Sequence, residues 1–372
     1  MTNNNQQAFF ALVRAGLWEK EARLLPYGDI DYAEVMRLAQ EQAVVGLVAA
    51  GLEHVTDVKV PQVWALRFAG QTIQLEQRNK AMNQFIADLV TNMRGMGIYT
   101  LIVKGQGVAQ CYERPLWRSS GDVDFFLSEE NFLKAREYLK PLVADGFNPN
   151  NDVSRNISAS LNSWDIELHT NMFCELSKEI DQGIKEVQDC VFFGGNVRSW
   201  MDEKTQVFLP DSDSDVIIIF THYLKHFYKG GLGLRQVCDW CRLLWYFRDK
   251  INLLLLEKRL RRMRLMSEWK AFGSFAVDYL GMPSKATPFY ISSNSWKRKA
   301  SRIMKYIMKV GNMGHNKDMS FYSEDKRFVK KFKAFWMRVK VLSSHARIFP
   351  IDSLRFLPYM VYSGVKSFLR GE

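Results

Sequence analysis

The chain has 372 residues, of which 47% are hydrophobic, and its formal net charge is +11. This composition excludes an intrinsically disordered chain, and the length predicts two domains or one domain with helical extensions. The basic excess favours an anionic partner such as a nucleotide, a nucleic acid or an acidic membrane surface, although charge alone does not choose among them.

The sequence shows no pattern of export or membrane insertion. Met1–Gln7 is polar and no long apolar region follows it, so we expect no signal peptide. No apolar run reaches the ~18 residues that a spanning helix needs. Five cysteines without framework spacing fit reduced thiols. We therefore expect a cytoplasmic protein, peripheral at the inner membrane face if it contacts a membrane at all.

Residues 1–97 are predicted to form an N-terminal helical region. Apolar residues recur every three to four positions in Ala8–Leu25 and Tyr32–Leu52. A longer helical pattern runs from Pro61 to about Met96. We expect this long segment to pack against a sheet and to lead into a strand at Tyr99–Val103.

Residues 98–208 are predicted to form an α/β core, beginning as strand, helix, strand. Ser128 is a candidate N-cap for a following helix that reaches about Ala144. Further strands are predicted around Gly146–Phe147 and at Ser163–Thr170, and Phe192–Trp200 is a candidate for one more.

Residues 209–290 are predicted to form a C-terminal helical domain. Helical periodicity marks four segments, Val216–Tyr228, Leu234–Phe247, Leu253–Met266 and Trp269–Leu280. Pro283 stops the last of them, and Ser284–Ser295 is a predicted linker.

Residues 291–372 are predicted to form a basic helical tail. Lys297–Lys309 and Lys326–Lys340 are rich in lysine and arginine, and Leu354–Leu369 is apolar with interspersed basic residues. A basic amphipathic helix can lie on an anionic membrane surface or contact nucleic acid, or it can simply pack on the protein with its lysines in water.

The chemistry-bearing residues gather around Leu101–Leu127. Asp122 and Asp124 are two residues apart in a predicted strand, so their side chains share one face. Two like charges this close are costly unless a cation lies between them, and paired carboxylates suit Mg²⁺. We expect that removing either acid leaves the fold intact or slightly more stable.

A third acid fits the same arrangement. Trp164–His169 alternates strictly, with Asp165, Glu167 and His169 on its polar face. Two half-exposed strands with solvated acids would explain Asp-x-Asp alone. Asp-x-Asp combined with Lys104-Gly105 and the later Glu-x-His favours a metal site instead.

Together these motifs resemble the nucleotidyltransferase superfamily, specifically a bacterial branch with a Lys-Gly, Asp-x-Asp and Glu-Leu-His core. The matching residues are Lys104-Gly105, Tyr112, Pro115, Arg118, Asp122-Val123-Asp124 and Glu167-Leu168-His169. A Gly-Ser pair usually opens the superfamily motif, and Lys104-Gly105 stands in its place. The resemblance extends more loosely over roughly residues 35–285.

The resemblance implies an α+β fold, with a mixed β-sheet core flanked by helical regions. It also implies transfer of a nucleotidyl group from a nucleoside triphosphate to a hydroxyl-type acceptor, whether a small molecule, a sugar, a protein or RNA. Asp122, Asp124 and Glu167 would be the catalytic, metal-binding acids, holding two Mg²⁺ ions, with Mn²⁺ as an alternative. Glu167 would serve the metal beside the acceptor.

Other residues receive roles in the same way. Nucleotide-binding candidates are Lys104, Gly105, Arg118, Ser119 and Ser120. His169 and Asp239 are accessory candidates. For His169 a satisfied structural role is favoured over that of a ligand, and Asp239 would pack its helix or line the acceptor pocket.

His222 and His226, with Cys238 and Cys241, contain the residue types of a zinc site. The two pairs fall on successive predicted helices with apolar residues interleaved, so buried packing explains them as well.

Two rival functions remain open on the sequence. One is a catalytically silent or weak nucleotide-binding module that acts in an assembly through its helical domains. The other is a nucleic-acid-binding protein, for which affinity should fall steeply with salt.

Overall fold

The computed structural model describes residues 3–144, 146–148, 156–314 and 341–369. Its contacts divide the chain into two compact units. The first comprises residues 1–40, 44–172 and 185–216, and the second comprises 41–43, 173–184 and 217–372. The four-part division expected from the sequence, with boundaries after residues 97, 208 and 290, stays a prediction.

The first unit begins with helices, as predicted for residues 1–97. They are α1 (Asn4–Trp18), α2 (Tyr32–Glu41), α3 (Val45–Glu53) and α4 (Gln62–Gly95). The prediction of one helix over Tyr32–Leu52 is wrong, because the chain turns at Ala43, whose φ of 54° is incompatible with a continuous helix. A short 3-10 turn, Leu25–Tyr27, lies between α1 and α2.

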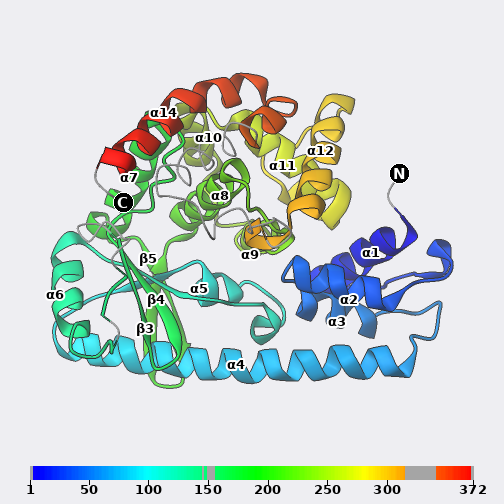
Figure 1. The fold of residues 1–372 in the computed structure, drawn as a ribbon, viewed down its shortest axis with the longest axis horizontal. Helices are drawn as coiled ribbons and strands as arrows, with labels where there is room; N and C mark the ends of the chain where they lie inside the picture. The colour runs from blue at the N-terminus through cyan, green and yellow to red at the C-terminus, as the bar shows by residue number, and fades with distance from the viewer. Residues whose placement is uncertain (1–2, 145, 149–155, 315–340, 370–372) are drawn as a thin grey trace. The chain divides into compact units, whose positions relative to one another are not determined.

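A four-stranded mixed sheet forms the centre of the first unit (Figure 1). Its order is β1-β2-β4-β3, with bounds β1 Leu101–Val103, β2 Val123–Phe126, β4 Trp164–His169 and β3 Asn156–Leu161. β2 and β4 are parallel, whereas β1 and β3 pair antiparallel with their neighbours. The predicted α+β fold with a mixed sheet is confirmed.

Short helices and a hairpin complete the α/β region. They are α5 (Gly105–Ala109), a 3-10 turn at Pro115–Trp117, α6 (Glu129–Leu139), α7 (Lys178–Phe193, in this unit from Lys185 onward) and the hairpin of β5 (Val197–Asp202) with β6 (Thr205–Pro210). Ser128 caps α6, as predicted, accepting a hydrogen bond from the backbone NH of Asn131 at 3.4 Å.

Three predictions for this region are wrong in detail. Gly146 and Phe147 form no strand; the strand is β3, whose alternating Ser and Ala residues carry little apolar signal. The helix expected to reach Ala144 ends at Leu139. Phe192 still belongs to α7, so the extended segment there begins only at Val197. α7 and β6 were not predicted.

One face of the sheet is buried under α4 and α6. Side chains of both helices form one apolar cluster with Val123, Phe125, Ile166 and Leu168 of the two central strands. Figure 1 shows α4 running along the sheet, with α6 at its edge. Because strand side chains alternate, the residues between these apolar ones face away from the cluster.

The second unit is helical. It contains α8 (Ser212–Lys229, from Ile217 onward), α9 (Leu234–Tyr246), α10 (Leu253–Met263), α11 (Met266–Leu280), a 3-10 turn at Ser284–Ala286, α12 (Asn294–Val310), a second at Asn312–Gly314, and α14 (Pro350–Leu369). The four predicted helices of residues 209–290 are present, with ends shifted by a few residues. The predicted basic segment Lys326–Lys340 lies outside the described residues.

No helix among the residues described here is long and apolar enough to cross a membrane.

Candidate active site

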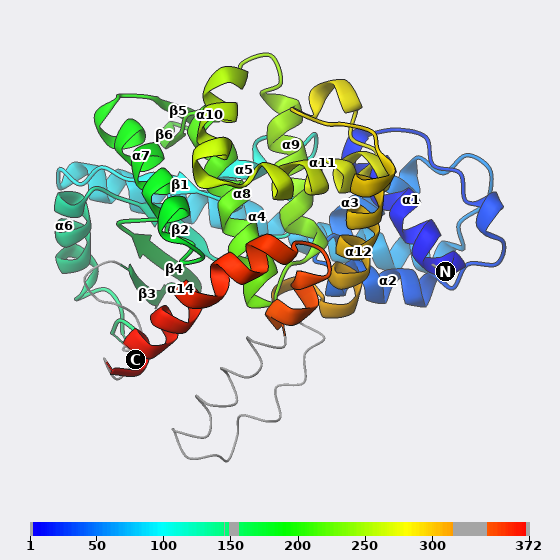
Figure 2. The ribbon, with the colours of Figure 1, turned by 90° about the horizontal axis from the view of Figure 1, so that it is seen from above.

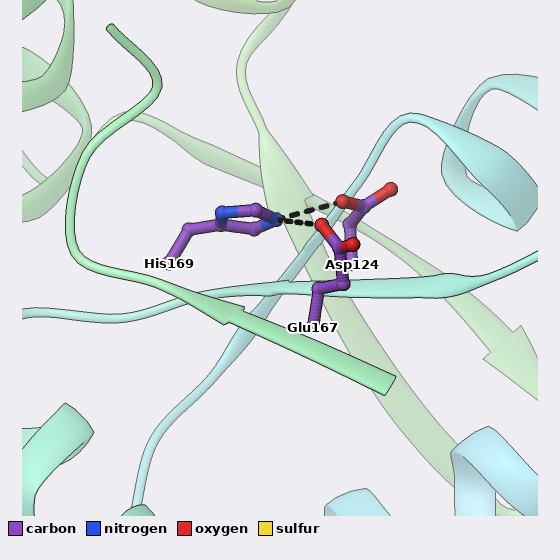
Figure 3. Close-up of side chains that lie close together, drawn as sticks. All are labelled: Asp124, Glu167 and His169. Atoms are coloured by element: carbon purple, nitrogen blue, oxygen red, sulfur yellow. Dashed lines mark hydrogen bonds and ion pairs between the residues drawn. The ribbon is translucent and has the colours of Figure 1, made fainter. Parts of the chain in front are cut away.

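The parallel pairing of β2 with β4 brings two predicted site acids together. Asp124 and Glu167 are register partners on these neighbouring strands. His169 lies two residues beyond Glu167 and so shares its face. Figure 3 shows the three side chains converging on one point. Strand alternation places Asp124 and Glu167 on the face opposite the apolar cluster.

His169 joins the two acids. Its Nε2 lies 2.8 Å from Oδ1 of Asp124 and 3.2 Å from Oε2 of Glu167. One ligand atom from each of the three residues lies within 4.8 Å of the others. His169 is therefore hydrogen-bonded, as expected of a structural histidine, and also belongs to a group that could bind a metal ion.

Lys104 binds the same carboxylate. Its Nζ donates to Oδ1 of Asp124 at 2.6 Å, and both side chains are largely buried. Lys104 immediately follows Val103, which is the register partner of Asp124 on β1. Its backbone φ is 56°, in the left-handed region that L-residues seldom adopt. This turn directs the chain from β1 into α5 beside the acids.

The surroundings set the ionisation of these acids. Burial alone would raise the pKa of Asp124, but Lys104 and His169 outweigh it and hold that pKa well below its usual range. The hydrogen bond from His169 likewise lowers the pKa of Glu167, against the effect of burial. Both groups are thus held as carboxylates, the form that binds metal.

Asp122 lies just before β2 and outside the three-residue group. Its side chain is exposed, but the protein atoms around its carboxyl group displace part of its hydration and so raise its pKa. The charge of Asp124 raises this pKa further. Asp165 is exposed and accepts a hydrogen bond from Oγ of Ser160 at 2.6 Å. Of the three predicted acids, the structure therefore brings Asp124 and Glu167 into direct contact with His169, with Asp122 at the edge.

The loop before Asp122 contains the predicted nucleotide-binding residues Arg118, Ser119 and Ser120. Arg118 is buried, and its Nη1 donates to the carbonyl oxygen of Ser119 at 3.1 Å and to Oγ of Ser120 at 3.0 Å. Gly105, the remaining candidate, has a φ of +30° at the start of α5. In the loop, Arg118 thus contacts both Ser119 and Ser120.

Two residues that hold this region were missed from the sequence. Asn79 on α4 is fully buried; its Nδ2 donates to the carbonyl oxygens of Leu116 at 2.7 Å and Arg118 at 2.8 Å. Its Oδ1 accepts from Nε2 of Gln106, on α5, at 3.1 Å. The available signal was a polar residue within the apolar stripe of a long helix, because such a residue needs buried hydrogen-bond partners.

The profile of a protein family described as "Uncharacterised nucleotidyltransferase" matches residues 28–280, more than half of the chain. The chain belongs to this nucleotidyltransferase family. Neither the curated proteins nor the solved structures contain a match. The matched range includes every predicted site residue.

The donor set of this site suits a divalent metal. Carboxylate oxygens are preferred by Mg²⁺ and Mn²⁺, and an imidazole is a better ligand for Mn²⁺ than for Mg²⁺. Asp124 and Glu167 supply the carboxylates and His169 the imidazole. The residues present therefore fit a divalent cation.

The remaining candidates belong to the second unit. Asp239 is buried on α9. The zinc candidates do not assemble among the described residues: His222 and His226 contact each other, with their Nε2 atoms 3.1 Å apart, but form no metal group with the cysteines. Burial raises the pKa of the Cys238 and Cys241 thiols, which opposes the thiolate form that zinc binds. Packing explains these cysteines.

Proposed function

We propose that the protein transfers a nucleotidyl group from a nucleoside triphosphate to a hydroxyl-bearing acceptor, with Mg²⁺ or Mn²⁺ as the metal. The observation that carries this proposal is the pairing of Asp124 with Glu167 across β2 and β4, with Lys104 in contact with Asp124. Family membership supports nucleotidyl transfer as the general reaction.

In this proposal Asp124 and Glu167 would hold the metal, with Asp122 at the exposed edge. The metal, when bound, would supply positive charge to the phosphates and to the attacking oxygen. Lys104, in contact with Asp124, and Arg118, in the loop before Asp122, would bind phosphate oxygens through their positive charges. A reaction of this class needs mainly positioning and charge from the protein, and these residues provide both.

The test is a screen of the purified full chain against ATP, CTP, GTP and UTP with Mg²⁺ or Mn²⁺. Pyrophosphate release and mass shifts of candidate acceptors would identify turnover. We expect activity to disappear in Glu167→Gln and to persist in the matched control Asp165→Asn, since Asp165 is exposed and bonded to Ser160. Turnover that is unaffected by Glu167→Gln would exclude this site.

A nucleotide-binding protein without turnover is the second candidate. The contact of Lys104 with Asp124 favours it, because an ammonium on this carboxylate competes with a metal ion. This function predicts triphosphate binding that is equal with and without divalent metal, and no pyrophosphate with any acceptor.

A further inference from the structure

One face of α12 in the second unit is a stripe of cations. Arg298, Arg302, Lys305 and Lys309 follow one another at spacings of four, three and four residues, so they share one side of the helix. All four are exposed. The opposite side is buried and apolar. The sequence contains no Asp or Glu between residues 279 and 317, so no acid of this segment offsets the charge of the stripe.

The cations of this basic stripe form no ion pairs within the part of the chain that the structure describes. Arg302 donates to the backbone carbonyl of Arg347, which is a neutral acceptor. Arg298, Lys305 and Lys309 form no ion pair with any described residue. Four exposed cations on one helix face favour an external anion.

α14 carries a second stripe, which is apolar. Ile351, Leu354, Pro358 and Tyr362 lie at spacings of three, four and four residues. Ile351 is 78% exposed, Leu354 71% and Tyr362 61%. The other side of α14 is anchored: Phe356 is fully buried against Tyr228, with ring centroids 4.8 Å apart. The helix therefore presents an exposed apolar stripe whose orientation is fixed by the buried side.

Arg302 of the basic stripe and the neighbouring Lys299 contact the segment that precedes α14. Besides the bond from Arg302 to Arg347, Nζ of Lys299 lies 4.7 Å from the ring centroid of Phe349, the residue before α14. In Figure 2 the segment of residues 341–349 leads into α14 near α12. Cations thus lie beside one end of an exposed apolar helix face.

We propose that α12 and the apolar stripe of α14 form a docking surface for an anionic lipid bilayer. Ile351, Leu354 and Tyr362 would enter the interface between headgroups and acyl chains, and the α12 cations would bind the headgroups. A nucleic acid would match the cations but would leave the aliphatic side chains in water. Charge complementarity together with an apolar stripe selects the lipid surface.

The test uses the full chain and vesicles of phosphatidylcholine, either alone or with 30% phosphatidylglycerol, in a cosedimentation assay. We expect binding only to the anionic vesicles. Arg298→Glu/Lys305→Glu should weaken it by at least about 30-fold, since each basic residue near an anionic surface contributes about fivefold. Ile351→Asn/Leu354→Asn, which leaves the charge unchanged, should weaken it by at least about tenfold.

Matched controls exist in the same unit. Leu254→Asn alters an aliphatic side chain that is 82% exposed on α10, and Lys250→Glu/Lys258→Glu makes the same charge change at two exposed lysines. Both should bind anionic vesicles like the unmodified protein. Circular dichroism and thermal melts would show that every variant is folded, as expected for changes at exposed positions.

Three results would overturn the proposal. Vesicle binding that depends on Arg298 and Lys305 but not on Ile351 and Leu354 would mean that no apolar face inserts. Binding of duplex RNA through α12, with no binding to either vesicle, would identify a nucleic-acid surface. Self-association in sedimentation velocity that Ile351→Asn/Leu354→Asn abolishes, without vesicle binding, would assign the stripe to a second copy.

Discussion

Asp124 is the most constrained site residue, because its Oδ1 accepts from both Lys104 and His169. The sequence suggested mutual repulsion of Asp122 and Asp124, but the structure pairs Asp124 with the largely buried ammonium of Lys104. Asp124→Asn should therefore destabilise the fold by about 3 kcal/mol, since it leaves the Lys104 charge buried without its partner. Asp122→Asn should be neutral or slightly stabilising, because the pKa of Asp122 is raised. Urea denaturation of both variants measures the difference, and equal stabilities would contradict it.

Glu167 should serve turnover more than nucleotide binding. Its side chain is partly exposed beside Asp124 and would meet charge that develops only in the transition state. Glu167→Gln should retain most affinity for the triphosphate and lower kcat by at least about 100-fold. Asp165→Asn, one strand repeat away, should change neither. Should Asp165→Asn be the inactive variant, the third metal ligand must be reassigned.

Lys104 should compete with the metal and assist the nucleotide. Lys104→Met removes the ammonium from Oδ1 of Asp124, so Mn²⁺ affinity without nucleotide should increase several-fold, measured by titration calorimetry. The KM for the triphosphate should rise about tenfold, because a phosphate contact is lost. Unchanged Mn²⁺ affinity would show that Lys104 does not limit metal binding.

At the scale of elements, α4 supports the site through Asn79. Asn79→Leu would leave the buried carbonyls of Leu116 and Arg118 without their donor, costing about 2 kcal/mol. The loop before Asp122 should loosen, which would raise the KM for the triphosphate more than it lowers kcat. Gln84→Leu on the same helix is the control, because the side chain of Gln84 donates to the exposed Asp88 of the same helix rather than to the loop. Equal effects of the two changes would contradict a positioning role for Asn79.

At the scale of the whole molecule, pH should change stability through Glu268. Burial first, and the charge of Asp352 second, raise its pKa from 4.5 to about 8, although Tyr228 donates a hydrogen bond to its Oε1. Between these values the folded state holds a proton that the unfolded state releases. The free energy of unfolding should therefore fall as pH rises through this window, by at most about 1.4 kcal/mol per pH unit, and level off above it.

Glu268→Gln keeps a neutral acceptor for Tyr228 and removes the titration. This variant should lose that slope and be the more stable protein at pH 8, measured by urea unfolding from pH 5 to pH 8. A slope that persists unchanged in the variant would assign the pH dependence to another group.

Much of the site followed from local patterns in the sequence. Strict alternation in Trp164–His169 placed Glu167 and His169 on one face, and the register shows Glu167 opposite Asp124. Ser128 before two acids marked the start of α6, because a cap depends on neighbouring residues only. The helical regions were readable from their periodicity, apart from the break at Ala43 and the missed α7. Two ends also differ, because α1 ends at Trp18 rather than Leu25 and α6 at Leu139 rather than Ala144.

Only the tertiary structure showed which groups touch. Lys104 and Asp124 are 20 residues apart, and His169 lies 45 residues beyond Asp124, yet Lys104 and His169 both bond to Oδ1 of Asp124. Asn79 acquires its role only because α4 packs beside the loop at Leu116 and Arg118. Periodicity within a segment determines which face a side chain takes, but strand order and helix packing determine its neighbours. Those depend on the burial of apolar surface over the whole unit, and no local pattern encodes it.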